Sequence, residues 1–174
     1  MRIAYVTGII LLALAAASSG QDAGNPKPKD GPPDSGVLID VKEMKVDYLM
    51  LRRPKPDGTV EEVASAQPVL QITIEITNKS DKEVTYKTAN GTPGTKDPVA
   101  AVRDSEGKVS AVVQFGATLE RVQGVKEAKL KPGESATDVL AFVQLPQGVK
   151  PVQLLLPASS HGSKGTWKIS LEGK

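Results

Sequence analysis

The sequence contains no cysteine, and this absence removes several classes of function at once. Disulfides, thiol nucleophiles and thiolate metal sites are all excluded. A domain without such crosslinks must obtain its stability from an apolar core. The 174-residue chain is long enough for one, since about 150 residues remain after a leader is removed and a domain of that size buries roughly 70% of its unfolded surface.

Charge of one sign and aromatic side chains are also scarce. The 22 basic residues nearly balance the 20 acidic ones, and removal of Arg2 with the leader leaves 21 basic residues and a net charge of +1. Such a balance attracts neither nucleic acid nor an anionic membrane surface. Aromatic residues make up only 3% of the chain and fall almost entirely at predicted inward positions. This disfavours sugar-binding and nucleic-acid-binding modules, which present exposed rings.

The N-terminal segment holds the only long apolar run and has the layout of a cleaved signal peptide. Arg2 precedes an apolar run over residues 9–17, and small residues follow at 18–20. The run is shorter than the roughly 20 residues that a membrane span requires. We therefore expect a signal peptide over residues 1–20, cleaved between residues 17 and 23, and a secreted or periplasmic protein without a transmembrane segment. An uncleaved anchor is the alternative, whereas a lipid anchor would need a cysteine.

A change in composition separates a linker from a folded domain. Residues 22–36 hold four prolines and three glycines and no large apolar side chain, so residues 21–36 are predicted to be a disordered linker. From Val37 onward Val, Ile, Leu and Thr become frequent and turn residues recur at short intervals. We expect one domain over residues 37–174.

The clearest periodicity in this domain is that of a strand with one buried face. Leu70, Ile72, Ile74 and Ile76 alternate with polar residues, which predicts one face in a core and the other in water. A type I turn is expected at residues 104–107, and a meander over residues 131–171 in which Trp167, Ile169 and Leu171 share a face. The other expected strands are 84–86, 99–103, 109–115, 137–145, 152–156 and 166–171. Short strands without a long helix between them favour an all-β antiparallel sandwich.

The first segment of the domain is ambiguous, because Val37, Val41, Met44, Tyr48 and Leu51 also fall at helical spacing. Its β-branched and aromatic content favours a strand instead. A bulge near residues 42–43 would place six side chains on one face, namely Ile39, Val41, Met44, Val46, Tyr48 and Met50. Residues 52–58, with two prolines, would then form a hairpin loop before a strand over 59–64.

The order of these strand and turn motifs resembles a known family. The motifs are residues 70–80 followed by Tyr86, the turn at 103–107, and residues 131–142 and 154–158. They are similar to a bacterial group of secreted or membrane-anchored immunoglobulin-like domains of unknown function, related in fold to a mycobacterial immunogenic secreted protein. The resemblance covers residues 37–171 and implies an immunoglobulin-like antiparallel β-sandwich. It brings no catalytic residues to carry over.

His161, the only histidine, lies beside Ser159 and Ser160 in a glycine-bounded loop. A nucleophile–base pair needs two converging side chains and a third group that orients the imidazole, and sequence neighbours rarely converge in this way. A single imidazole is also a weak metal site. We expect His161 to be a solvated loop residue.

Four further motifs have ordinary structural interpretations. Residues 133–137 begin like a nucleophile elbow but have Thr137 where glycine is needed, so they are interpreted as a hairpin turn. Ser105 and Lys108 match the Ser-x-x-Lys spacing of penicillin-recognising enzymes but straddle a predicted tight turn instead of sharing a helical turn. Acidic residues show no calcium-loop spacing. The basic cluster Arg52, Arg53 and Lys55 is interpreted as a solvated hairpin tip, and the sequons at Asn78 and Asn90 as incidental. We therefore expect no catalytic, cofactor-binding or metal-binding residues.

Taken together, these patterns favour a secreted, non-enzymatic binding module that engages an unknown protein or envelope component. We expect recognition by the long, turn-rich loops 87–98 and 116–127, because a rigid sandwich usually presents recognition loops. The apolar residues Leu119, Val122 and Val125 of the second loop are equally well explained as a cap on one end of the sandwich. A hydrolase or small-ligand carrier with a site built from dispersed residues, and a structural spacer, are the alternatives.

Overall fold

A computed structural model of the chain describes residues 35–91, 96–116 and 118–172, so the expected signal peptide and almost all of the linker lie outside the described residues. The described part is built of antiparallel strands with one short 3₁₀ helix, which confirms the all-β class. No helix in it is long and apolar enough to cross a membrane. The elements are β1 (Val37–Asp47), β2 (Met50–Pro54), β3 (Val60–Ala64), β4 (Val69–Asn78), β5 (Val84–Lys87), β6 (Ala101–Asp104), β7 (Val109–Ala111), β8 (Glu120–Arg121), β9 (Glu127–Leu130), β10 (Ser135–Val143), β11 (Pro151–Pro157), η1 (Ala158–His161) and β12 (Thr166–Ser170).

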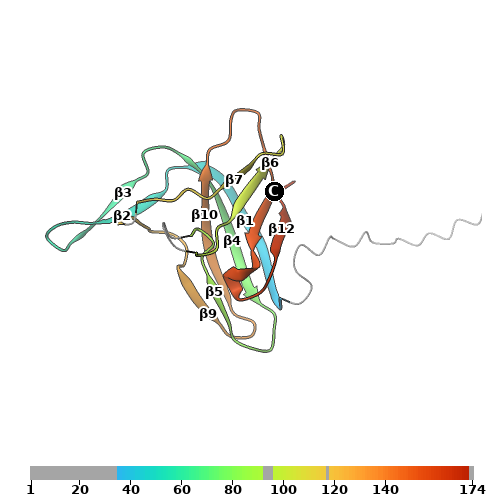
Figure 1. The fold of residues 1–174 in the computed structure, drawn as a ribbon. Coiled ribbons are helices and arrows are strands. Elements are labelled where there is room, and N and C mark those ends of the chain that lie inside the picture. Colours follow the sequence, from blue (N-terminus) through green and yellow to red (C-terminus); the bar gives the residue numbers. More distant parts are fainter. Residues whose placement is uncertain (1–34, 92–95, 117, 173–174) are drawn as a thin grey trace, which may run out of the picture.

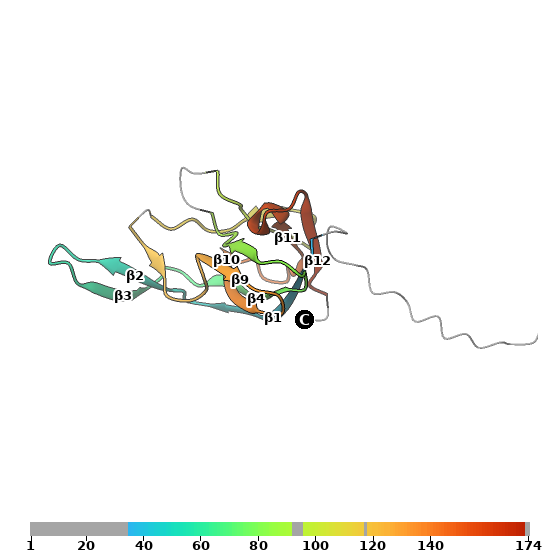
Figure 2. The same ribbon diagram turned by 90° about the horizontal axis from the view of Figure 1, so that it is seen from below.

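Two sheets enclose the main core, an arrangement consistent with a β-sandwich (Figure 1). One has the strand order β1-β4-β10 and the other the order β12-β11-β6-β7. Ile72 and Phe142 from the first sheet and Leu154, Leu156 and Trp167 from the second belong to one buried cluster. Two smaller sheets, β3-β2-β8 and β5-β9, are attached to this body, and the β2–β3 hairpin projects from it in both views (Figures 1 and 2).

Strand β4 confirms the predicted buried face but not the predicted wet one. Leu70, Ile72, Ile74 and Ile76 are all buried, yet Gln71 on the opposite face is also only 3% exposed. The reason is that the chain after β1 folds over this face. Nε2 of Gln71 donates hydrogen bonds to the carbonyl oxygens of Asp47 (3.2 Å) and Tyr48 (3.3 Å). A second apolar cluster forms there, from Leu49, Leu51, Val69, Val139 and Ala141.

Strand β1 contains the predicted bulge, as its register against β4 shifts between Val41 and Glu43. Beyond the bulge Met44 packs against the main core as predicted, but Val46, Tyr48 and Met50 are exposed, so the predicted face is wrong for these three. The strand ends at Asp47 and the chain turns before β2, so that Leu49 and Leu51 point inward instead. The expected loop at 52–58 is shorter than predicted, since residues 52–54 are paired in the β2–β3 hairpin.

The predicted meander over residues 131–171 is wrong for its first two strands. β10 pairs with β4, whereas β11 pairs with β12 and β6 in the other sheet. β10 and β11 therefore face each other across the core, which Leu140 and Leu154 both help to fill, rather than lying side by side. Trp167, Ile169 and Leu171 share a buried face as expected. The turn at residues 104–107 is also confirmed, with a 3.0 Å bond from the Gly107 amide to the Asp104 carbonyl.

Candidate functional site

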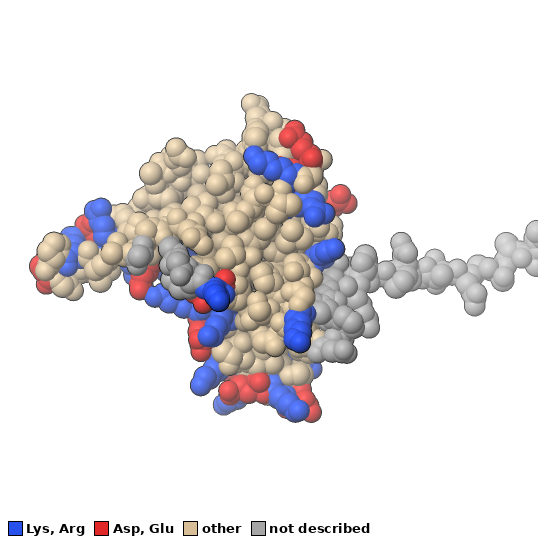
Figure 3. Space-filling model, in the orientation of Figure 1, with Lys and Arg blue, Asp and Glu red and all other residues tan. Residues whose placement is uncertain are grey.

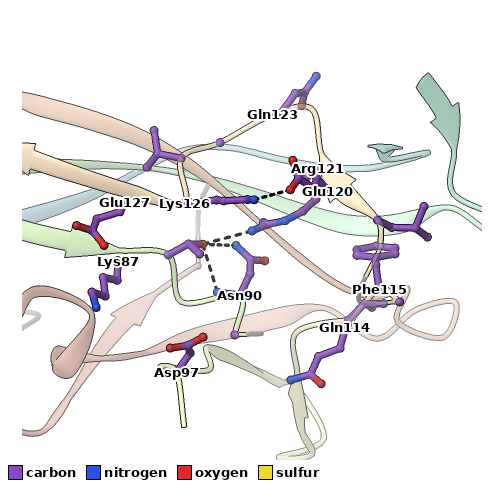
Figure 4. A pocket seen from close by; sticks show the side chains of 17 residues that line it. Lys87, Asn90, Asp97, Gln114, Phe115, Glu120, Arg121, Gln123, Lys126 and Glu127 are labelled. Atoms are coloured by element: carbon purple, nitrogen blue, oxygen red, sulfur yellow. Dashed lines mark hydrogen bonds and ion pairs between the residues drawn. The ribbon is translucent and has the colours of Figure 1, made fainter. Parts of the chain in front are cut away.

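The two loops expected to carry recognition meet in the structure. Their described parts line a cavity of about 360 Å³, within the size range of small-ligand pockets. Lys87 and Glu127 lie at one side of this cavity, and Gln114 and Phe115 lie at the other (Figure 4). We call this hollow the polar cavity.

The floor of the polar cavity closes the free edge of β10. Asn90 donates from Nδ2 to the Val139 carbonyl (3.1 Å), and its Oδ1 accepts the amide of Ala141 (3.4 Å). One side-chain amide thus occupies two of the edge groups of β10, and the Val113 amide donates to a third, the Ala141 carbonyl (2.7 Å). Arg121 points toward Asn90 (Figure 4) and donates to the same Val139 carbonyl. These side chains anchor both loops on one strand.

A fully buried carboxylate, Asp138, lies behind this floor. Its Oδ2 accepts hydrogen bonds from the hydroxyls of Tyr86 (2.7 Å) and Thr88 (2.6 Å), and its Oδ1 accepts the Val139 amide (2.8 Å). Gly124 lies so close that a Cβ atom there would be 2.6 Å from Oδ1 of Asp138. Asp138 thereby joins β5 and the start of the first loop to β10, and the second loop packs closely against it.

Burial dominates the electrostatics of this group. It raises the pKa of Asp138 above its ordinary value, although hydrogen bonds from Thr88 and Tyr86 oppose the shift. Burial also raises the pKa of Tyr86, and the charge of Asp138 adds to that effect. The pKa of Arg121 is lowered by burial, against the attraction of Asp138. The positive charge of Arg121 attracts the carboxylate of Asp138, but Asp138 is fully buried and Arg121 is partly buried.

The hydrogen-bonding capacity of this network is used internally. Among the described residues, no buried side-chain nitrogen or oxygen lacks a partner, and no group of His, Cys, Asp and Glu is placed to hold a metal ion. At the rim, Nζ of Lys126 lies 2.7 Å from Oε1 of Glu120. The charged residues that line the cavity are three basic and three acidic ones. The arrangement holds the loops in place and offers no field of one sign to an ion.

A second hollow adjoins the polar cavity and has the opposite chemistry. It has a volume of about 1120 Å³ and shares one wall with the cavity, formed by Val113, Phe115 and Leu119. Of the described residues that line it, Arg53 is the only charged one. We call it the apolar groove; its other lining residues are Leu51, Val63–Val69, Thr118 and Val143–Pro146. In Figure 3 the surface at the upper left, next to the projecting hairpin, is correspondingly without charged side chains.

The groove lies where the second apolar cluster ends. Leu51 and Val69 belong to that cluster, and Val63, Phe115 and Leu119 pack against it while remaining partly exposed. Val143, at the end of β10, leaves 62% of its surface in solvent. The cluster residues themselves are buried, and the apolar side chains that stay partly exposed are those that line the groove.

The second loop, residues 116–127, also packs against the apolar clusters, as its alternative interpretation as a cap implied. Leu119 packs against the second cluster and Val125 against the main core. The amide of Val122 donates to the Met50 carbonyl at 3.0 Å. The loop therefore closes the end of the sandwich and lines both hollows at the same time.

The expectation that His161 is solvated is wrong, because only 6% of its surface is exposed. The indole of Trp167 donates to its Nε2 at 3.3 Å, which leaves the proton of the neutral ring on Nδ1. Nδ1 faces Oγ of Ser160 at 3.3 Å. The imidazole thus donates toward the serine, the reverse of a general base, and Ser160 is itself 1% exposed.

The remaining motifs have structural roles. The amides of Asn78 and Asn90 are buried and donate to backbone carbonyls, so neither sequon is presented at the surface. Ser105 and Lys108 flank the turn that follows β6. Residues 131–134 form a turn as expected, but it joins β9 and β10 of different sheets, so the hairpin interpretation is wrong. The basic cluster lies on the β2–β3 hairpin, where Arg52, Arg53 and Lys55 pair with Glu61 and Glu62.

Sequence reasoning missed both the Asp138 network and the apolar groove. The network had a signal, because Asp138 has the same strand parity as the core residues Leu140 and Phe142, and a buried acid implies hydrogen-bonding partners. No sequence pattern indicated the groove, because its walls come from segments far apart in the chain.

Comparison of the chain with protein-family models, curated protein sequences and solved structures finds no match in any of the three.

Proposed function

We propose that this chain is an extracytoplasmic, non-enzymatic binding module with an immunoglobulin-like β-sandwich, and that it engages another protein. The observation that carries this proposal is the uncovered apolar groove. Contiguous apolar surface rimmed by polar residues is typical of interaction sites, because its burial against a partner is favourable. A structural spacer has no need of such a surface.

The chemistry of the described residues supports a binding role over catalysis. His161 is buried and lines neither of the two hollows, and the carboxylate of Asp138 is enclosed by its donors. Neither group can meet a substrate in this conformation. The immunoglobulin-like assignment rests on the family resemblance of the sequence motifs, and the two antiparallel sheets around one core are compatible with it.

A small-ligand carrier is the second candidate, favoured by the volume of the polar cavity. Its lining of both charge signs suits an uncharged or zwitterionic polar compound. Native mass spectrometry of the protein purified from its own host would show a bound mass in this case.

In-cell photo-crosslinking tests the binding role. Val143 at the groove and, as a control, Val109 on β7 are each replaced by a photoreactive amino acid; both side chains are exposed, by 62% and 48%. We expect a discrete protein adduct from position 143 that position 109 does not give, with the partner identified by mass spectrometry. Absence of an adduct at 143, or identical adducts at both positions, would contradict the proposal.

A further inference from the structure

We propose that the apolar groove binds an extended, uncharged apolar segment of the partner, flanked by an acidic residue at the end nearest the hairpin tip, and that this segment pairs with the free edge of β3. This inference rests on the proposed binding function and specifies the partner's chemistry. It follows from the size of the groove, the free strand edge beside it, and the charges on the hairpin.

The size of the groove indicates a polypeptide segment. Its volume of about 1120 Å³ exceeds the usual range for small-molecule pockets, roughly 300–1,000 Å³. Its walls come from the hairpin, the Val63–Val69 connection and the end of β10. Walls contributed by several separate segments suit an extended chain that places alternate side chains in the groove.

A free strand edge lies beside these walls. β3 is the terminal strand of the β3-β2-β8 sheet and pairs on one side only, with β2. The hairpin that carries it stands away from the body of the molecule in both views (Figures 1 and 2). An added strand would pair with main-chain groups of β3 while its side chains reach Val63 and Val143 in the groove.

The charges at the hairpin select the flanking residue. Arg53, which lines the groove, and Lys55 share one carboxylate, that of Glu61, with Lys55 Nζ at 3.2 Å from Oε2. Asp57 and Glu62 bring the whole hairpin to three basic and three acidic side chains, but among the described residues that line the groove Arg53 is the only charged one. An acidic residue of the partner complements the Arg53 charge at this end of the groove, whereas a basic residue is repelled.

A second copy of this chain fits the edge poorly. Antiparallel self-pairing of β3 would bring the adjacent acids Glu61 and Glu62 of the two copies opposite one another. Like charges directly opposite in a sheet are destabilising. The edge of β3 is therefore better suited to a different chain than to β3 of a second copy.

Defined peptides provide the test. The probe is a short fluorescein-labelled peptide in which valine and serine alternate and two aspartates end the chain, compared with the same peptide ending in two lysines. Fluorescence anisotropy is measured with the wild-type protein, Val143→Asp, Arg53→Gln and the control Val109→Asp. All of these positions are exposed, so the variants are expected to fold, which circular dichroism verifies.

We expect the aspartate probe to bind the wild type and Val109→Asp equally, and Val143→Asp at least about tenfold more weakly, or about 1.4 kcal/mol. The lysine probe should bind the wild type several-fold more weakly than the aspartate probe, and Arg53→Gln should reduce that preference. N-methylation of alternate peptide groups of the probe should abolish binding, because it removes the donors that a strand needs.

The inference is overturned if neither probe binds, if Val143→Asp and Val109→Asp bind alike, or if N-methylation has no effect. It is also overturned if sedimentation shows a wild-type dimer that Val143→Asp dissociates, since the groove would then be filled by a second copy. These outcomes concern the chemistry of the groove, whereas a failed crosslink at position 143 in cells concerns the binding function, so the two failures are distinguishable.

Discussion

The hydroxyl of Tyr86 donates a 2.7 Å hydrogen bond to Oδ2 of Asp138 and so joins β5 of a small sheet to β10 of the main one. Both side chains are fully buried. A buried carboxylate in this position is tolerated only because both oxygens accept hydrogen bonds. Removal of one donor destabilises the fold, because a buried acceptor is left without a partner. Asp138 also accepts a hydrogen bond from Thr88, in the first of the two loops that line the polar cavity.

Tyr86→Phe should lower the free energy of unfolding by about 1–3 kcal/mol, because it removes the hydroxyl donor and leaves the ring in place. Chemical denaturation measures the change. Tyr48→Phe is the matched control, since Tyr48 is 53% exposed and its loss of a hydroxyl should have no measurable effect. Equal effects of the two changes would mean that the buried hydrogen bond contributes nothing.

Asp138 should make stability depend on pH in an unusual direction. Its folded pKa is raised above the ordinary value of 3.8, so the folded state holds the proton more tightly than the unfolded state does. Its contribution is therefore most favourable at or below about pH 4 and declines as the pH rises toward the folded pKa. The stability difference between wild type and Asp138→Asn should shrink or reverse over that rise, as measured by urea denaturation from acid to neutral pH. A constant difference would show that the folded and unfolded pKa values are alike.

His161 should have the opposite dependence. Burial lowers its pKa from the ordinary value of 6.5, so the unfolded state takes up a proton first and stability falls as the pH drops below that value. His161→Gln keeps an acceptor for the Trp167 indole and should abolish this part of the pH dependence. Fluorescence of Trp167, the only tryptophan, reports unfolding in both proteins. Superimposable pH profiles would refute the assignment.

Gly124→Ala should be more destabilising than Gly107→Ala. Both glycines have a positive φ, +86° and +83°, and a left-handed alanine costs about 1–2 kcal/mol in either place. A Cβ at Gly107 meets open space, whereas at Gly124 it would meet Asp138 and add an overpacking cost of about 1–3 kcal/mol. Thermal unfolding of both variants measures the difference, and equal losses would contradict the close approach.

Phe142→Ala should cost about 3–5 kcal/mol, because Phe142 is fully buried and its removal leaves a cavity in the main core. Val143→Ala, one residue further along the same strand, is the control, and its change should lie within about 0.5 kcal/mol because its side chain is mostly in solvent. Denaturation midpoints give both values. A similar loss at both positions would mean that β10 faces the core differently.

Local patterns were sufficient for much of the fold. The alternation from Leu70 to Ile76, the bulge after Val41 and the turn at Asp104 each depend on neighbouring residues, and each is confirmed. The prediction failed at Tyr48, where the side chain is exposed although it continues the apolar periodicity. No local signal there shows that the strand stops and that Leu49 turns inward to cover the neighbouring face.

The candidate site was predictable in part. The loops that line the polar cavity were identified from their length and turn residues, but their closure over β10 depends on Asn90 and Arg121 meeting one carbonyl group. His161 shows the same limit, because Trp167 lies only six residues further along the chain, yet the sequence does not indicate that its indole packs against the imidazole.

The sequence by itself determined the strand-rich class, the inward faces of single strands and the turns, because these follow from side-chain periodicity and backbone preference over a few residues. Only the tertiary structure decided that β10 and β11 lie in opposite sheets, that Asp138 is buried among its donors, and that an apolar groove stays open beside β3. Each of these depends on which distant segments pack together. That choice is made by the sum of many weak contacts across the chain, and no short segment encodes it.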